Sequence, residues 1–548
     1  MEEGIDIFER NTGMPSWSDI LDANYHFVFH KTNEFGPGQF AHTDALFTER
    51  WPELQDAGFI RGTFDLVHFN AGSPEDQAMT AVGMVKRLVP GDLGPSIDME
   101  DRDANHTAAK APGFWVDFAN RYLDTIETAL GRQPLIYTSK SYWTEFTDDS
   151  PDFADYPLWV IDVNHAVAVI PPAWTRWTFF QWHTELNKSA MPAPFKASDA
   201  GVDLDHFDGT IYQLRGMADL EHTAPHLVED INYIAYTALD GHIHVMVSLL
   251  GKWEDTDVFT DLTDAPPAAG DPAAAGVGKE QVIIYRGKDA HIYALSRPGT
   301  DLTDHWTVLD ITGSEAVDDP RLCVLGNDIH VVYWNKFDSQ SHMIRTGGTW
   351  TPERLSGAAA SGSAAILVYE NVVRAVSRGG TDGHLHEYSR QNDTETDVDL
   401  TAGAHDASGN PAPAATYRPS ICFPREKAPR IVYRALRGAI WMIERDTLLA
   451  TPLTAAGDPV AVGSPAAVVA ETMHVIYRTA TGDLIDLFDD SGTIRSQTIP
   501  CGVAAAGDPT AYYDGSRACV SFRAVDDAIH FARDVDGAWV CETAAPSI

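Results

Sequence analysis

Two acidic residues, Asp98 and Glu100, lie one residue apart in the sequence LGPSIDMEDRD at positions 93–103. The apolar residues around them predict a buried strand. Alternate side chains of a strand point to opposite faces, so Ile97 and Met99 share one face and the two carboxylates share the other. Burying an unpaired charge costs several kcal/mol, and two neighbouring carboxylates raise the pKa of at least one of them.

This pair of acids suits an enzyme that needs one protonated and one ionised carboxyl side by side. Glycoside-cleaving sites have that requirement. The D-x-E pattern alone also fits two solvated residues at the edge of a sheet. The surrounding elements therefore decide between a catalytic and a surface role.

Residues 1–219 alternate short apolar runs with amphipathic helical stretches at 43–57, 75–88 and 108–130. The predicted strands are 4–7, 25–30, 61–67, 95–99, 134–138, 157–163, 177–182 and 201–207. Eight strands with mostly helical connections predict a parallel α/β barrel of the (β/α) type. In such barrels the chemistry lies at the carboxyl ends of the strands. Asp6 ends the first strand and Asp203 lies in the last, so four acids from three strands are expected to meet.

The order of eight motifs in this segment resembles the glycoside hydrolase family 25 lysozymes, the Chalaropsis-type N-acetylmuramidases. The resemblance covers nearly all of residues 4–215. The motifs are GIDIF (4–8), FVFHKTNE (27–34), LQDAGFIRG (54–62), SIDMED (96–101), PLIYTSKSYW (134–143), PLWV (157–160), FFQWHT (179–184) and GVDLDHFDG (201–209).

The resemblance implies that Glu100 is the general acid and that Asp98, Asp6 and Asp203 surround the reacting sugar. Glu100 is then expected to hold a proton near neutral pH, because the charge of Asp98 and partial desolvation both raise its pKa. Asp98 is expected to remain ionised, and either to stabilise an oxocarbenium ion or to orient the substrate's acetamido group. The candidate sugar-binding residues, for which a packing role fits equally, are Tyr137, Trp159, Gln181 and Trp182. No metal or cofactor is expected.

Two positions depart from the family pattern. Gly62-Thr63 leads into Phe64-Asp65-Leu66, where the family has a Tyr-His-Phe-like triplet, and Glu34 is followed by Phe35 instead of Gly. These departures leave the shape of the sugar subsites open. An inactive, sugar-binding relic is the corresponding alternative.

A phrase of about 48 residues repeats seven times after about residue 225. Its anchors are Tyr236, Tyr285, Tyr333, Val376, Tyr433, Tyr477 and Phe522. Repeats of this length made of short strands predict a seven-bladed β-propeller over residues 225–548. The repeat length and the Y-R-x-x-D-G-x-I core resemble the fucose-binding bacterial lectin propellers, which implies a carbohydrate-binding domain. A scaffold or protein-docking disc is the alternative.

Two His-x-His pairs, His242/His244 and His384/His386, fall at equivalent places in the repeat. Such pairs can bind metal ions. Because they recur at a turn of the repeat, we interpret them as repeat consensus and expect no metal there.

The net charge of −40 argues against nucleic acid and anionic membranes as partners, because phosphate contacts need Lys or Arg. The charge fits a solvated acidic surface, or adaptation to high salt, where self-repulsion is screened. No run of 18 apolar residues is present, and the start MEEGIDIFER lacks a signal-peptide pattern. The five cysteines leave at least one thiol free.

These observations predict a multidomain, monomeric extracellular enzyme, secreted or otherwise released. We expect an antibacterial lysozyme that cleaves the β-1,4 bond between N-acetylmuramic acid and N-acetylglucosamine in peptidoglycan, with a propeller that binds cell-surface glycans. The alternatives are a non-catalytic carbohydrate-binding protein and a hydrolase of another amino-sugar polymer such as chitin.

Overall fold

The computed structural model describes residues 1–35, 41–100, 111–184, 191–197, 201–228, 231–249, 252–262, 264–299, 305–354, 360–391, 394–424 and 428–545. The chain forms two compact units, Met1–Ala218 and Asp219–Ile548. The prediction of a multidomain protein with an α/β first part and an all-β second part is confirmed.

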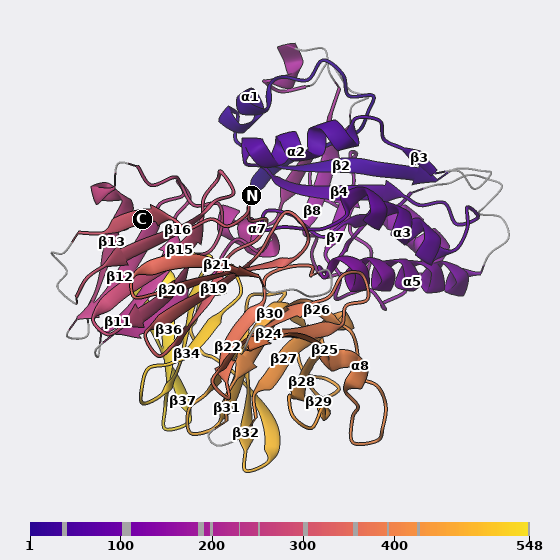
Figure 1. The fold of residues 1–548 in the computed structure, drawn as a ribbon. Coiled ribbons are helices and arrows are strands. Elements are labelled where there is room, and N and C mark those ends of the chain that lie inside the picture. Colours follow the sequence, from indigo (N-terminus) through magenta and orange to yellow (C-terminus); the bar gives the residue numbers. More distant parts are fainter. Residues whose placement is uncertain are drawn as a thin grey trace. The chain divides into compact units, whose positions relative to one another are not determined.

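The first unit is built on a closed ring of eight strands, because β1 pairs with both β9 and β2. Of these strands, β2, β4, β7 and β8 are labelled in Figure 1. Going round the ring, the strands are β1 (Glu2–Ile7), β2 (Tyr25–Phe35), β4 (Ile60–Leu66), β5 (Ser96–Met99), β6 (Leu135–Thr138), β7 (Leu158–Ile161), β8 (Phe179–His183) and β9 (Asp203–Phe207). A short strand, β3 (Ala41–Thr43), extends β2. The helices are α1 (Trp17–Asp22), α2 (Phe47–Ala57), α3 (Pro74–Val85), α5 (Pro112–Leu130), α6 (Lys140–Thr147) and α7 (Ile211–Met217), with a 3-10 turn at Phe195–Ala197.

The ring differs from the predicted parallel barrel in its last part. Strands β1, β2 and β4 to β8 pair in parallel, but β9 runs antiparallel to both β8 and β1. The connection between β7 and β8, which is described throughout, contains no helix. Pro171 and Pro172 lie in that connection, and prolines remove the backbone donors that a helix needs. An antiparallel strand needs no helical crossover, so β9 can close the ring without one.

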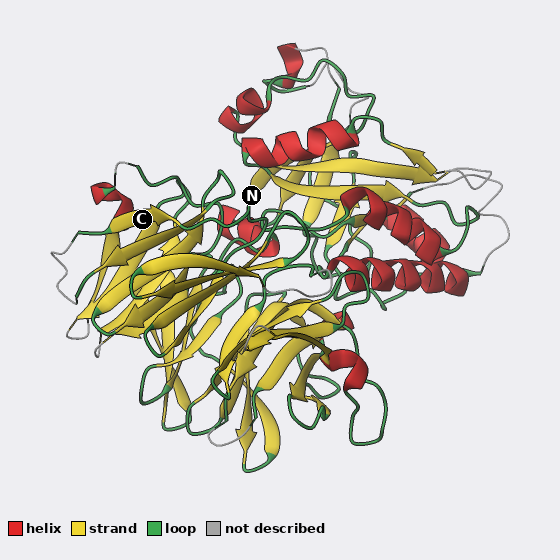
Figure 2. Ribbon diagram, viewed as in Figure 1, coloured by secondary structure: helices red, strands yellow, loops and turns green. Residues whose placement is uncertain are grey.

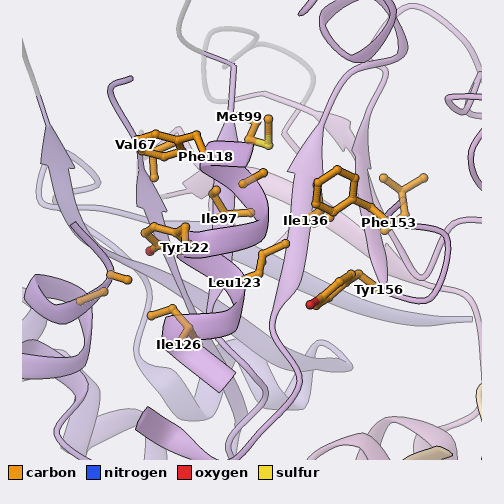
Figure 3. Close-up of a cluster of buried hydrophobic side chains, with 14 of the residues drawn as sticks. Val67, Ile97, Met99, Phe118, Tyr122, Leu123, Ile126, Ile136, Phe153 and Tyr156 are labelled. Carbon is orange, nitrogen blue, oxygen red and sulfur yellow. The ribbon is translucent and has the colours of Figure 1, made fainter. Parts of the chain in front are cut away.

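Helices α3 and α5 pack against the outer face of the ring through one apolar cluster, part of which Figure 3 shows. Apolar residues at helical spacing on α5 meet Ile97 and Met99 of β5 there. The helix begins with Pro112 and ends at Gly131, whose φ of 68° is a left-handed cap conformation. The prediction that Ile97 and Met99 share a face is confirmed, and Asp98 therefore points into the ring.

Aromatic side chains fill part of the ring interior. Phe29 stacks on Trp159 with ring centroids 4.2 Å apart and meets Phe179 edge to face at 5.0 Å. Two glycines make this packing possible, since a Cβ at Gly4 or Gly62 would lie 2.3 Å from the ring of Phe27 or Phe29. Any larger residue at these positions would collide with the aromatic core.

The second unit consists of seven four-stranded antiparallel sheets. Figure 2 shows that strands make up most of this unit. The innermost strand of each sheet contacts that of the next, and β34 contacts β10, so the seven sheets form a closed propeller. The predicted seven blades are confirmed. In blade order the strands are β10 (Ala224–Val228), β11 (Ile231–Thr237), β12 (Ile243–Leu249) and β13 (Lys252–Asp257); β14 (Ala273–Val277), β15 (Glu280–Arg286), β16 (Ile292–Arg297) and β17 (Thr307–Asp310); β18 (Arg321–Leu325), β19 (Asp328–Trp334), β20 (Gln340–Thr346) and β21 (Thr349–Arg354); β22 (Ala365–Tyr369), β23 (Val372–Arg378), β24 (Leu385–Gln391) and β25 (Thr394–Asp399); β26 (Ala415–Cys422), β27 (Arg430–Ala435), β28 (Ile440–Glu444) and β29 (Ala450–Pro452); β30 (Ala461–Val469), β31 (Met473–Thr479), β32 (Leu484–Asp490) and β33 (Thr493–Thr498); and β34 (Thr510–Tyr513), β35 (Ala518–Arg523), β36 (Ile529–Val535) and β37 (Ala538–Ala545). Short helical turns are Val258–Asp261, Leu400–Gly403 (α8) and Leu436–Gly438.

An arginine near the end of the second strand of a blade binds the beginning of the next blade. Arg378 donates to the carbonyl of Ala415 at 3.0 Å, and Arg434 to that of Ala461 at 2.8 Å. In the last blade Arg523 binds Glu221, which precedes the first blade, at 2.6 Å. The contact that joins successive blades therefore also closes the ring.

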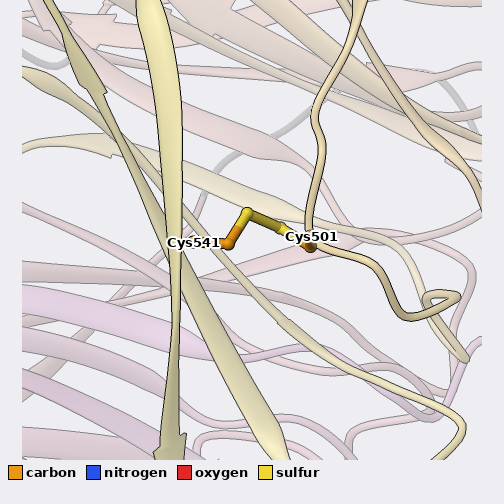
Figure 4. The surroundings of a disulfide bond; sticks show 2 residues. All are labelled: Cys501 and Cys541. Carbon is orange, nitrogen blue, oxygen red and sulfur yellow. A yellow bond between two sulfur atoms is a disulfide. The ribbon is translucent and has the colours of Figure 1, made fainter.

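A disulfide joins Cys501, in the connection after blade 6, to Cys541 on β37 (Figure 4). The other three cysteines, Cys323, Cys422 and Cys519, are free thiols. The bond fastens the outer strand of the last blade to the connection that leads into that blade. Among the described helices none is long and apolar enough to cross a membrane.

We expect Glu221→Ala to destabilise the propeller. Both side chains of the Glu221–Arg523 pair are at most 5% exposed. Glu221→Ala removes the buried partner of Arg523 and leaves it paired with Asp527, which is 3.3 Å away and 28% exposed. Loss of a buried partner costs up to about 3–5 kcal/mol. Calorimetry of the full chain should show the propeller transition at a lower temperature.

The matched control is Glu315→Ala, which breaks the Lys336–Glu315 pair, whose side chains are 42% and 52% exposed. Exposed pairs contribute less than about 1 kcal/mol, so this variant should unfold close to the unmodified protein. Equal effects of the two substitutions would contradict the role of Glu221 in closing the ring.

Candidate active site

The predicted acids meet at one edge of the ring. Asp6 lies near the carboxyl end of β1, Asp98 lies on β5, and Glu100 directly follows β5. Asp203 is the first residue of β9 and lies opposite Asp6 in the strand register. Because β9 is antiparallel, its first residue, not its last, lies at the carboxyl edge of β1. The structure thus brings the four predicted acids together, although the last strand runs opposite to the predicted direction.

Burial divides these acids into two kinds. Asp6 and Asp98 are 6% and 3% exposed, Asp203 is half-buried, and Glu100 is exposed. Burial and then the charge of Glu100 raise the pKa of Asp98 well above its usual value, while Lys31 acts in the opposite direction. Asp98 is therefore expected to be protonated when no substrate is bound. The sequence had suggested instead that Asp98 stays ionised.

A fifth acid, Asp205, was missing from the predicted site. It lies two residues after Asp203 on the same face of β9 and is completely buried. The indole Nε1 of Trp159 donates to its Oδ1 at 2.8 Å. Burial raises the pKa of Asp205 to about 8, although the bond from Trp159 lowers it. The sequence GVDLDHF could have indicated Asp205, because residues two apart on a strand share a face and Asp203 was already predicted at the site.

The four predicted sugar-binding residues occupy different places. Tyr137 lies beside Asp98 in the register, and its hydroxyl donates to Gln181 Oε1 at 2.5 Å. Trp159 is 1% exposed and belongs to the aromatic core of the ring. Trp182 lies on the opposite face of β8 from Gln181 and packs against the clusters outside the ring. The structure therefore brings Tyr137 and Gln181 to the acids and places the two tryptophans in packing positions.

The departure at Phe64-Asp65-Leu66 adds no acid to the site. Asp65 pairs with Ile97, so it faces outward toward α5, where Asn33 Nδ2 and the Tyr122 hydroxyl each donate to it at 2.9 Å. Thr32 also donates to it. Burial raises the pKa of Asp65 to about 6, although these hydrogen bonds lower it.

The His-x-His pairs of the propeller are bound to aspartates of a neighbouring strand. His242 and His244 contact Asp257 and Asp255 at 2.9 and 3.0 Å. His384 and His386 contact Asp399 and Asp397 at 2.8 and 2.9 Å. The same pairing recurs in two blades, as expected for repeat consensus.

In the described part of the chain, one group has the spacing of metal ligands: Asp219, His222 and Asp508. Arg418 donates to Asp219 at 2.7 Å and lies 3.0 Å from His222 Nε2. A guanidinium already supplies the positive charge that these carboxylates require. We therefore interpret the group as a structural ion-pair network.

The propeller also carries a recess of about 590 Å³ between blades 2 and 3. Phe337 stands at its border and is 70% exposed. The lining is otherwise mainly polar and consists of His291, Asp310, Thr312, Gly313, Ser314, Glu315 and Lys336.

Comparison with known proteins relates the first unit to one enzyme family. Residues 5–190 match the family model Glycosyl hydrolases family 25. Lysozyme M1 of Streptomyces globisporus is 25% identical over 232 residues, which is 40% of this chain and 71% of that protein. A muramidase from Acremonium alcalophilum is 22% identical, with a TM-score of 0.35, over 40% of this chain and 99% of that structure. The lectin SapL1, in complex with alpha methyl fucoside, is 14% identical, with a TM-score of 0.35, over 52% of this chain and 97% of that structure.

Replacing Asp65 by Asn should change how stability depends on pH. With a folded pKa of about 6 against a usual 3.8, Asp65 binds its proton more tightly in the folded state. Its contribution to stability is full below about pH 4 and is lost as the pH rises through 6. Between pH 4 and pH 7 the unfolding free energy of Asp65→Asn, relative to the unmodified chain, should therefore rise by up to about 3 kcal/mol.

Urea unfolding of the full chain, followed by tryptophan fluorescence, measures this difference. Asp117→Asn is the control, because Asp117 lies on α5 with a side chain 64% exposed. Parallel pH curves for Asp65→Asn and the unmodified protein would show that Asp65 does not titrate as its burial requires.

Proposed function

The first unit of this chain is a glycoside hydrolase domain of family 25, and from that premise we propose that it is a lysozyme acting on peptidoglycan. It cleaves the β-1,4 bond between N-acetylmuramic acid and N-acetylglucosamine. The observation that carries the proposal is the convergence of Asp6, Asp98 and Glu100, all within the matched segment, with Asp203 at one edge of the ring.

Glu100 is the general acid in this mechanism. It is exposed at the edge of the site, where it can reach the oxygen of the leaving sugar and donate a proton to it. A positive charge then develops on the sugar that is left behind. Proton transfer at this position requires a group that solvent and substrate can both reach, and Glu100 is the only exposed member of the four predicted acids.

Asp98 stabilises that positive charge from its buried position. The oxocarbenium-like transition state is a cation, and an adjacent cation lowers the pKa of a carboxyl. In the bound complex the single proton of this pair lies on Glu100, so Asp98 is ionised and either stabilises the charge directly or orients the acetamido group of the substrate. Tyr137 and Gln181 provide a polar wall beside it.

The second part of the proposal is that the propeller binds glycans of the bacterial surface. A chain with a net charge of −40 gains no electrostatic attraction to an anionic cell wall, so a separate binding unit supplies the affinity. The recess beside Phe337 offers an exposed aromatic face next to hydroxyl, carboxylate and imidazole groups, which suits a sugar ring.

The enzyme acts outside the cell, where its polymeric substrate is found. The Cys501–Cys541 disulfide supports this proposal, because disulfides persist mainly in oxidising compartments. The proposal is compatible with any route of release that leaves the two units folded, and it requires only that both reach the wall.

We expect Glu100→Gln to abolish wall lysis and to leave the fold intact. Gln has the same shape but cannot deliver a proton, and loss of a general acid typically lowers the rate by about 10²–10⁴-fold. Turbidity of purified walls measures lysis, and mass spectrometry should place the new reducing ends on N-acetylmuramic acid. The control is Glu75→Gln, since Glu75 is an exposed acid on α3 paired with Arg121.

Each alternative function gives a different result in this experiment. Undiminished lysis by Glu100→Gln would remove Glu100 from the role of general acid. Reducing ends on N-acetylglucosamine, or faster cleavage of chitin, would identify another amino-sugar polymer as the substrate. Wall binding without any cleavage by the unmodified chain would indicate a carbohydrate-binding protein.

A chain ending at Ala218 should cleave soluble peptidoglycan fragments at nearly the full rate and should lyse intact walls more slowly. The four predicted acids lie in this unit, which has its own apolar core. Tethering raises the concentration of an enzyme at a surface, and several weak sites reinforce one another. Full-length Phe337→Ala, compared on both substrates, tests the recess separately. Equal lysis of intact walls by the truncated and full chains would exclude the targeting role.

A further inference from the structure

We propose that Asp205 is a positioning residue of the site, which shares one proton with Asp6 and holds Trp159 in place. Asp6 then presents a neutral carboxyl instead of a negative charge. This inference rests on the proposed lysozyme function for its kinetic consequences, whereas the shared proton itself is independent of that function.

The strand register places Asp6 and Asp205 next to each other inside the ring. Asp6 lies opposite Asp203, and Gly4, two residues earlier on the same face of β1, lies opposite Asp205. Gly4 has no side chain. The carboxyls of Asp6 and Asp205 therefore face the same volume from adjacent strands, with no side chain of β1 between them.

One oxygen of each carboxyl lacks a donor. Asp205 Oδ1 accepts from Trp159, but Asp205 Oδ2 and Asp6 Oδ2 are both buried, and no other described residue donates to either. Unsatisfied buried carboxylate oxygens are costly. A single proton satisfies both oxygens, because a protonated carboxyl donates one hydrogen bond and an ionised carboxyl accepts it.

The surroundings favour keeping that proton. The groups near the pair on β1, β5 and β9 are acidic: Glu3, Asp98 and Asp203, with Glu100 just beyond β5. Strands β6, β7 and β8 contribute Tyr137, Trp159 and Gln181, which are neutral at neutral pH. The nearby amine is Lys31 of β2, which is paired with Glu34 at 2.9 Å.

The electrostatics agree with the geometry. Burial, and then Asp203 and Asp205, raise the pKa of Asp6 well above its usual value. Burial raises the pKa of Asp205 to about 8. The hydrogen bond between the two carboxyls favours the proton on Asp6 and the negative charge on Asp205, so Asp6 is the donor and Asp205 the acceptor.

The arrangement has two consequences for the site. A protonated Asp6 can donate a hydrogen bond to a substrate oxygen, and it adds no further negative charge beside Asp98 and Asp203. Asp205 also fixes the indole of Trp159, which packs against Tyr137 with ring centroids 4.7 Å apart. Asp205 thus acts on substrate through Asp6 and Trp159.

The test is Asp205→Asn in the full chain. Asn keeps the shape and can accept from Trp159, but its amide donates to Asp6 and stabilises the ionised form of Asp6. We expect the alkaline limb of the pH profile of kcat/KM to move at least about one unit to lower pH. At pH 7 we expect KM to rise at least about fivefold, with a smaller change in kcat, because the lost interaction is one of substrate binding. Asp208→Asn, at an exposed acid just after β9, is the matched control.

A spectroscopic measurement keeps the inference testable whatever the activity. Infrared or carbon NMR spectra of the unmodified chain, labelled at aspartate, should show protonated carboxyl signals at pH 7, and Asp205→Asn should lose one of them. An unchanged number of protonated carboxyls, or an unshifted pH profile, would overturn the proposal. If the unmodified chain shows the shared proton but cleaves no wall polymer, the proposed function fails and the shared proton stands.

Discussion

The closure of the eight-stranded ring through β1 is the constraint on which the site depends. Because β1 pairs with both β9 and β2, the inward side chains of all eight strands share one enclosed volume. Phe27, Phe29 and Trp159 fill part of it, and Gly4 and Gly62 leave the space for these rings. The remaining inward positions near one edge carry carboxyls. The same closure that produces a stable core therefore forces acids from distant parts of the sequence into contact, with few cations beside them.

The period of two residues along a strand made much of this site predictable. It separated Ile97 and Met99 from Asp98, whereas Asp6 and Asp203 were predicted from their places in the first and last strands and from the family resemblance. It could not give the direction of β9, because an alternating pattern reads the same from either end. The same period places Gln181 and Trp182 of FFQWHT on opposite faces, so the prediction of both at the site was inconsistent, and Trp182 packs outside the ring. Asp205 followed from the same alternation as Asp203 and was missed because only one acid of that strand was expected.

The repeat of the propeller was predictable for a different reason. The Tyr-Arg pair in its core phrase combines two separate tasks, since residues such as Tyr285 are fully buried and the following arginine binds the next blade. The fourth blade shows the limit of this pattern. Its arginine is Arg378, so the anchor equivalent to the tyrosines is the buried Ser377, not Val376. Because Ser377 stands where most other blades have an aromatic residue, the sequence pattern was hard to align in this blade. The arginine contact to the next blade is nevertheless present, as the structure shows.

The carboxylates around Asp508 in the propeller and those inside the ring of the first unit are buried in opposite ways. In the propeller, Asp508 is fully enclosed, yet Arg478 and His222 outweigh the effect of burial and lower its pKa to about 2. Asp271 in turn outweighs burial and raises the pKa of His222 to about 10, so these groups are ionised and paired at neutral pH. Inside the ring of the first unit Lys31 only partly offsets the effect of burial on Asp98, and the pKa values of Asp6, Asp98 and Asp205 rise instead. Paired charges hold blades together but exchange no protons near neutral pH, whereas unpaired buried acids keep protons that a reaction can use. The arginine and histidine around Asp508 therefore distinguish this structural network from the acids of the candidate site.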